Sequence, residues 1–263
     1  MIPIRDSERS RSIPYVNVAI IALNFAMFFY EVWLSNHTAF GVIGNTRITS
    51  ELDRFMFHWA NIPACTFDAL GWDRDLRATG VSVCSAQPHP EWTIFSAMFM
   101  HGSWIHILGN MLFLWIFGDN VEDAMGHVLY AAFYLIAGTA GSVTHGLVDP
   151  AALTPALGAS GAIAGVMGAY IVLYPRATVS VIIPIFFFIP FPLPAFILIG
   201  FWFLAQVLSG FSALGVSTVG AAGGVAYFAH IGGFIAGAML VNVFTFSRPR
   251  RRPRPVRERR DVG

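Results

Sequence analysis

The chain has 263 residues, of which 56% are hydrophobic and only 12% are formally charged. Soluble domains have roughly 25% charged residues, so this composition excludes an ordinary water-soluble fold. The formal net charge of +1 points to no particular class of binding partner, and it gives no reason to expect nucleic acid.

Residues 1–15 form a polar segment that carries Arg5, Arg9 and Arg11, and we expect it on the cytoplasmic side of a membrane. The apolar run Val16–Leu34 follows and is long enough to cross a hydrocarbon core of ~30 Å. No convincing small-residue cleavage site comes after it. We therefore expect this run to remain as a membrane anchor rather than to be removed as a signal peptide.

Residues 35–91 are the only sizeable stretch with soluble character, because charged side chains there alternate with aromatic ones. This mixture favours short amphipathic helices at the membrane surface over a separate folded domain. Both cysteines, Cys65 and Cys84, lie in this loop. On an oxidising side of the membrane they could form a disulfide, and two free buried thiols are the alternative.

Between Ala124 and Ser247 the only formally charged residues are Asp149 and Arg176, which predicts a membrane domain. Residues 179–192 are very apolar but rich in proline, so we expect a membrane-dipping connection there instead of one continuous helix. The fold class that follows is an all-α membrane protein, a bundle of six transmembrane helices over residues 16–246. After the first span, the predicted spans are Ile94–Phe117, His127–Leu147, Leu157–Tyr174, Pro194–Leu214 and Gly224–Phe246.

The orientation of the chain is indicated by arginine. All sixteen basic residues are Arg, and eight of them lie in the tail 247–263, which we expect to be cytoplasmic and without fixed structure. A partner-binding role for this tail is the alternative to a topology signal. Six spans place both termini on one side, the loop 35–91 outside and the acidic turn Gly118–Gly126 inside. The Arg-flanked ends favour a bacterial inner (plasma) membrane.

Polar residues inside predicted spans are informative because burying them in a bilayer is costly. His106 and Asn110 are four residues apart and share one helix face. Ser160 and His230 each stand among glycines, and the spacings Gly161-x-x-x-Gly165 and Gly233-x-x-x-Gly237 allow close helix packing. At about 1.5 Å per residue from the inner span ends, His106, Ser160 and His230 lie at similar heights, roughly 18–24 Å.

These residue types fit acyl transfer. A serine hydroxyl needs a base within about 3 Å, and neutral imidazole is the usual one. No buried carboxylate is placed to orient His230, so we expect Ser160 as nucleophile and His230 as general base in a dyad. The available donors for an oxyanion are the His106 ring, the Asn110 amide and the backbone N–H of Ser160.

Three motifs in order resemble the rhomboid family of intramembrane serine proteases. They are His106-x-x-x-Asn110 in the second span, Gly158-x-Ser160-Gly161 opening the fourth, and Ala229-His230-x-x-Gly233-x-x-x-Gly237 in the sixth. The resemblance covers roughly Trp92–Phe246, and Gly118–Gly126 looks like the cytosolic turn of the family. Some members stack an aromatic residue, one turn after the serine, on the catalytic histidine, whereas this chain has Ala164 there.

The resemblance implies a recessed serine reached by water from the outer face, and cleavage of membrane-anchored proteins within or near their transmembrane segments. It implies no metal and no cofactor. It also implies that the fifth span acts as a lateral gate, here with Phe201, Trp202 and Phe203, and that the loop 35–91 is a partly buried structural element.

Three other functions remain to be weighed. A non-catalytic rhomboid-like membrane protein that binds transmembrane clients would not need the Ser160 hydroxyl. A transporter or channel would favour more intramembrane charge and paired broken helices than this sequence offers. A metalloprotease would need a metal-binding motif, and the sequence has no His-Glu-x-x-His.

Overall fold

The computed structural model describes residues 2–8, 10–44, 46–71, 83–183, 187–214 and 225–246. The predicted Arg-rich tail 247–263 lies outside these residues. The helices are α1 (Tyr15–Ser35), α2 (Glu51–Trp59), α3 (Pro63–Ala69), α4 (Thr93–Ala97), α5 (Trp104–Met125), α6 (His127–Val148), α7 (Ser160–Leu173), α8 (Ala195–Leu214) and α9 (Tyr227–Thr245). The strands are β1 (Ile2–Asp6), β2 (Thr38–Ile43), β3 (Thr46–Ser50), β4 (Thr178–Ile183) and β5 (Phe187–Pro194).

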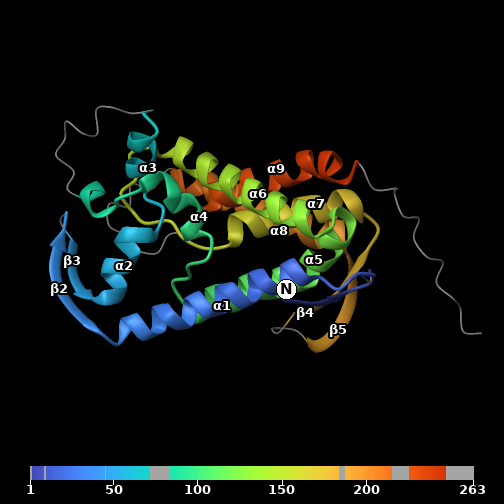
Figure 1. Cartoon of the computed structure of the whole chain (residues 1–263). Helices are drawn as coiled ribbons and strands as arrows, with labels where there is room; N and C mark the ends of the chain where they lie inside the picture. The colour runs from blue at the N-terminus through green and yellow to red at the C-terminus, as the bar shows by residue number, and fades with distance from the viewer. Residues whose placement is uncertain are drawn as a thin grey trace, which may run out of the picture.

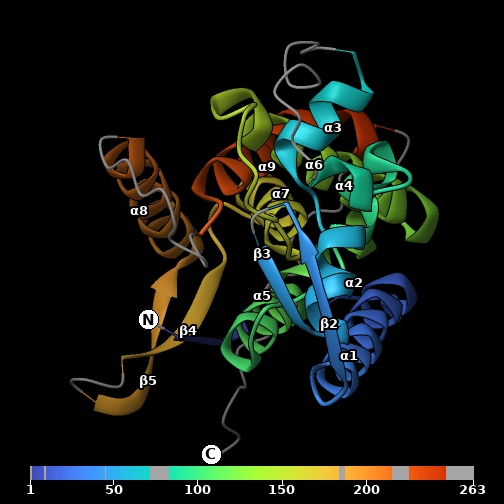
Figure 2. The same ribbon diagram turned by 90° about the vertical axis from the view of Figure 1, so that its left-hand side faces the viewer.

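Six long helices form the body of the molecule, and in the described part of the chain four of them, α1, α6, α8 and α9, are long and apolar enough to cross a membrane. Helix α5 has 22 residues, and α7 is a shorter apolar helix of 14 residues. Figure 2 shows α7 almost end-on, with α5, α6 and α9 around it. The protein is therefore a mostly helical membrane protein, as predicted in outline, and five strands that the all-α prediction did not include accompany the helices.

The predicted second span, Ile94–Phe117, has the wrong boundaries. A short helix, α4, is followed by a turn, and α5 begins only at Trp104, where the Ser103 side chain accepts a hydrogen bond from the backbone N–H of His106. This serine cap satisfies a donor that an uninterrupted helix would have paired internally. The site residues His106 and Asn110 consequently lie in the first two turns of α5.

The prediction of a turn at Gly118–Gly126 is also wrong, because α5 continues to Met125. Gly126, with a φ of 84°, caps the end of the helix. The acidic side chain of Glu122 in this stretch is fully buried and accepts hydrogen bonds from the backbone N–H groups of Val16 and Asn17, at 3.0 and 2.7 Å. The carboxylate thus supplies the N-terminal cap of α1 from another helix.

A three-stranded antiparallel sheet in the order β1-β4-β5 joins the N-terminus to the segment before α8. The structure confirms that the proline-rich stretch is not one helix, but it forms a β-hairpin, which the sequence did not predict. Pro190 and Pro192 lie in β5, an edge strand, where a missing backbone donor is tolerated. The opposite edge strand, β1, runs along the C-terminal half of α5 (Figure 1).

The large loop after α1 contains the hairpin β2–β3, with α2 and α3 at the same end of the molecule (Figure 1). The short helices were predicted, and a disulfide joins Cys65 to Cys84. Asn61 exchanges two backbone hydrogen bonds with Ala156, at 3.0 and 2.7 Å. The loop therefore braces the segment that leads into α7, which agrees with the expected structural role.

Candidate active site

Ser160 and His230 are in direct contact. Ser160 is the first residue of α7 and His230 lies in the first turn of α9, and the distance from Ser160 Oγ to His230 Nε2 is 2.7 Å. The His230 side chain is buried, whereas Ser160 is half-buried. A serine hydroxyl within hydrogen-bond reach of an imidazole is the arrangement that nucleophilic catalysis requires.

Close packing between α7 and α9 brings these two residues together. Gly233 and Gly237 of α9 lie directly on the backbone carbonyl oxygens of Gly161 and Gly165 of α7, so a Cβ at either α9 position would collide with the α7 backbone. The two small-residue spacings seen in the sequence therefore face each other. Because Ser160 and His230 lie next to this contact, the glycines set the distance between their helices.

His106 reaches the same place from α5. Gly158, two residues before Ser160, has a φ of +123° and donates its backbone N–H to the carbonyl of Ala97 at 2.8 Å. A Cβ at position 158 would lie 2.8 Å from both Cε1 and Nε2 of His106, and 3.7 Å from Ser160 Oγ. The His106 ring thus borders the peptide segment that carries the serine.

Asn110 takes part in a different contact. Its Nδ2 lies 2.9 Å from Nε2 of His101, whose ring centre is 5.0 Å from that of His106. The backbone N–H of His101 in turn donates to the buried carboxylate of Glu31 at 3.1 Å. Of the four predicted site residues, the structure brings Ser160 into contact with His230 and places His106 beside Gly158. Asn110 is bonded to His101 instead.

Gln206 of α8 is a contact that the sequence analysis missed. Its Oε1 lies 2.7 Å from Nδ1 of His230, the ring nitrogen opposite the one that meets Ser160. An uncharged polar side chain in an apolar helix is costly in a membrane unless it has a partner. That cost is the signal that could have found Gln206, because it is the only Gln, Asn or charged residue of α8.

The three predicted gate residues point to different neighbours. The ring of Trp202 lies 5.7 Å from that of His230. Phe203 stacks on Phe234 of α9 with ring centres 4.3 Å apart. Phe201 lines an apolar cavity of about 150 Å³ between α5, α7 and α8, together with Phe113, Met167, Leu198, Ile199, Trp202 and Ala205.

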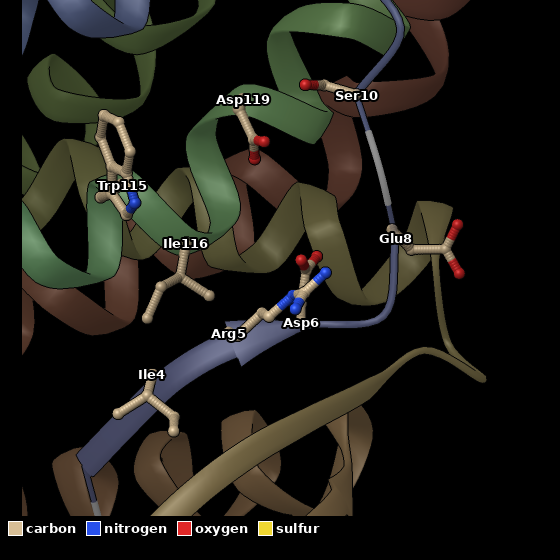
Figure 3. A pocket seen from close by; sticks show the side chains of 8 residues that line it. All are labelled: Ile4, Arg5, Asp6, Glu8, Ser10, Trp115, Ile116 and Asp119. Atoms are coloured by element: carbon tan, nitrogen blue, oxygen red, sulfur yellow. The ribbon is translucent and has the colours of Figure 1, made fainter.

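A second cavity, of about 380 Å³, lies at the far end of α5 (Figure 3). Asp6, on β1, accepts hydrogen bonds there from Tyr170 Oη at 2.6 Å and from Asn120 Nδ2 at 2.9 Å. Burial raises the pKa of Asp6 to about 7. Asp119 of this cavity is 13 residues after His106, or about 20 Å along the helix, so this is not the serine site. The lining residues are Ile4, Arg5, Asp6, Glu8, Ser10, Trp115, Ile116 and Asp119.

Comparison with known proteins identifies relatives of this chain. The chain is 29% identical over 157 residues to RHOMBOID-like protein 1 of Arabidopsis thaliana, which covers 59% of the chain and 39% of the relative. It is 32% identical over 153 residues to Rhomboid protein 1, mitochondrial, of Saccharomyces cerevisiae, covering 56% of the chain and 40% of the relative. A shorter match, 35% over 78 residues, is to RHOMBOID-like protein 5 of Arabidopsis thaliana, covering 30% of the chain and 25% of the relative.

The matched segments thus span two fifths or less of the length of these curated relatives. The family model of the Rhomboid domain matches residues 89–247, which is more than half of the 263-residue chain. The match contains Ser160, His230, His106 and Asn110. The chain therefore belongs to the rhomboid family of membrane proteins.

Proposed function

We propose that this protein is an intramembrane serine endopeptidase that cleaves the transmembrane segments of membrane-anchored proteins. The observation that carries the proposal is the 2.7 Å contact between Ser160 Oγ and His230 Nε2 at the N-terminal ends of two closely packed helices. Membership of the rhomboid family supports it.

The proposed reaction is a two-step acyl transfer. His230 Nε2 takes the proton of the Ser160 hydroxyl as Oγ attacks the carbonyl carbon of the scissile peptide bond. The imidazolium then gives that proton to the leaving amine, and an acyl-enzyme remains on Ser160. In the second step His230 takes a proton from water, hydroxide adds to the ester carbonyl, and the acid product leaves as Oγ recovers its proton.

The negative charge of each tetrahedral intermediate needs fixed donors. As the first residue of α7, Ser160 has a backbone N–H without an acceptor inside the helix, and the helix dipole places positive potential there. The His106 ring, on the other side of Gly158, is the second proposed donor. We assign Asn110 as a third, because one hydrogen of its amide remains after the bond to His101.

The membrane arrangement that we propose has six spans, with α5 and α7 added to the four helices of span length. Residues 1–15 and 247–263 then lie in the cytoplasm, and the end of the bundle that holds Ser160 opens to the outer face. A bacterial inner membrane remains a prediction. Helix α8, which carries Phe201, Trp202 and Phe203, would move as a lateral gate to admit the substrate helix.

The test is cleavage of a generic single-span membrane protein by the purified full chain in detergent, with Ser160→Ala as the matched variant. Removing the nucleophile typically costs about 10⁶ in kcat, so no cleavage by the variant is expected. A fluorophosphonate probe should label the wild type at Ser160 and leave the variant unlabelled. Cleavage that persists in Ser160→Ala contradicts the assignment, and a wild type that neither cleaves nor takes the probe favours a non-catalytic protein that binds transmembrane clients.

A further inference from the structure

His230 has two hydrogen-bond partners in the structure, one on each ring nitrogen. Ser160 Oγ lies 2.7 Å from Nε2, and Gln206 Oε1 lies 2.7 Å from Nδ1. Which nitrogen of a neutral imidazole carries the proton is decided by the partner of the other nitrogen. A carbonyl oxygen can only accept a hydrogen bond, so Gln206 Oε1 requires that Nδ1 carries the proton and leaves the Nε2 lone pair facing the serine.

This tautomer is the one that a general base needs. If the amide group of Gln206 were reversed, its NH₂ group would donate to Nδ1, and the ring proton would then move to Nε2. The base would point a hydrogen at Ser160 Oγ instead of a lone pair. The orientation of one amide side chain therefore separates a competent pair from an incompetent one.

The packing of α8 on α9 fixes the position of Gln206. Trp202, Gln206 and Gly210 recur every four residues and so share one face of α8. The Trp202 ring lies 5.7 Å from the His230 ring, and a Cβ at Gly210 would lie 3.3–3.5 Å from atoms of Tyr227 and Phe228. Both contacts are made to the first turn of α9, which also carries His230.

We propose that Gln206 is a positioning residue that holds His230 in the tautomer and orientation required for proton transfer from Ser160. The proposal rests on the serine protease function proposed above. It adds a third, uncharged member to the pair and assigns it to α8, the proposed gate helix, so that the base is correctly oriented only while α8 is seated on α9.

An amide suits this position better than a carboxylate would in a membrane. A carboxylate would stabilise the imidazolium more strongly, but the site lies within apolar helices, where an isolated charge is costly. A glutamine orients the ring by a neutral hydrogen bond at a much smaller cost. The choice predicts a base whose protonation is not favoured by a neighbouring charge.

The first experiment compares Gln206→Met with Gln206→Glu, using Leu208→Met as the matched control because Leu208 is exposed on the surface of the same helix. Methionine keeps the length of the side chain but offers only a weak acceptor. We expect Gln206→Met to lower kcat by about 10- to 100-fold with little change in KM, since general-base catalysis contributes about 10²–10⁴-fold. Leu208→Met should behave as wild type.

The pH profile separates orientation from simple packing. In Gln206→Glu the carboxylate again offers an acceptor to Nδ1, and its charge favours the imidazolium. Activity should therefore recover at higher pH, and the acidic limb of the kcat/KM profile should move to higher pH. A residue that only filled space would change the amount of folded protein, checked by thermal unfolding in detergent, without moving this limb. Wild-type kcat in well-folded Gln206→Met would overturn the proposal.

A second measurement reads the tautomer without any cleavage. In protein labelled with ¹⁵N-histidine, the ring shifts of His230, assigned by the loss of its signals in His230→Ala, show which nitrogen carries the proton. We expect Nδ1–H in wild type and a mixture of tautomers in Gln206→Met. Nε2–H in wild type would refute the role of Gln206. If wild type shows Nδ1–H but no Ser160-dependent cleavage or probe labelling, the protease function fails while the positioning contact stands.

Discussion

Gly233 of α9 lies against the backbone carbonyl oxygen of Gly161 of α7. Gly233 is three residues after His230, and Gly161 directly follows Ser160. There is no room for a methyl group between them, because a Cβ at Gly233 would overlap that oxygen. The neighbouring atom belongs to the backbone, so it cannot rotate away as a flexible side chain would. The separation of α7 and α9, and with it the Ser160–His230 distance, depends on this contact.

We therefore expect Gly233→Ala to push α9 away from α7 and to lower kcat by at least about 10-fold, together with a loss of stability of about 1–3 kcal/mol. Gly200→Ala is the matched control, because a Cβ at Gly200 in α8 meets nothing within 4 Å. Cleavage assays and thermal unfolding in detergent would compare the two. Full activity in Gly233→Ala would show that the glycine contact does not set the geometry of the site.

Gly158 allows a second prediction. Its φ of +123° is disfavoured for residues with a side chain, and its missing Cβ leaves room for the His106 ring. Gly158→Ala should displace His106 from the segment before Ser160 and weaken the proposed oxyanion site. Removing one such donor costs about 10²–10³ in kcat, so we expect a fall of that order.

Gly102→Ala is the control for this change, since its Cβ would make an ordinary contact, 3.9 Å from Leu157. Labelling by the fluorophosphonate probe should fall in parallel with peptide cleavage in Gly158→Ala. Both reactions build negative charge on an oxygen bound to the atom that Ser160 attacks. Unchanged kcat in Gly158→Ala would remove His106 from the oxyanion site.

The Ser160–His230 pair could be predicted from the sequence, because the two residues lie at similar heights in their predicted spans and stand in motifs that occur in the order of the rhomboid family. The sequence was not sufficient for the start of α5, since residues 94–99 and the residues after Trp104 have similar hydropathy. The break there depends on the Ser103 cap and on the bond from Gly158 to Ala97, and the second of these joins distant parts of the chain.

The sheet and Gln206 could not be predicted for a related reason. Strand β1 pairs with β4 across more than 170 residues, with Ile2 opposite Ile182, and no local window of sequence contains both partners. Gln206 belongs to no recognised motif and gains its meaning only when α8 packs on α9. Local patterns therefore identified most of the long helices and the Ser160–His230 pair, while contacts between distant segments decided the rest.

The docking of β1 should depend on pH. Burial raises the pKa of Asp6 from 3.8 to about 7, the Tyr170 hydrogen bond lowers it, and the nearby acidic residues Asp119 and Glu8 raise it further. Since the pKa is higher in the docked state than in the free strand, the contribution to docking is complete below about pH 4. It is lost as the pH rises through about 7.

Hydrogen exchange of residues 2–6, measured at about pH 5.5 and about pH 8.5 and corrected for intrinsic rates, should show less protection at the higher pH. Asp6→Asn is the matched variant, because asparagine keeps the shape of the side chain and does not titrate. Its protection should be the same at both pH values. Equal protection of wild type at both pH values would mean that the charge of Asp6 does not control the docking of β1. The other charged residue on this strand is Arg5.

The disulfide gives the last prediction. The bond between Cys65 and Cys84 closes a segment with a sequence separation of 19, and a loop of that length is stabilised by about 3 kcal/mol in the chain-entropy account. Cys65→Ala/Cys84→Ala should therefore unfold at a lower temperature than wild type in detergent. Asn61 in this loop is bonded to Ala156, which lies four residues before Ser160. Cleavage by the double variant should therefore stay close to that of wild type at low temperature and be lost on milder heating.

Treating wild type with a thiol reductant should reproduce the effect, whereas the double variant should not respond to the reductant. If the double variant unfolds at the wild-type temperature, the loop between α1 and α4 is held by its packing alone, through the buried residues Ile62 and Phe67. The disulfide then does not contribute to the support of α7.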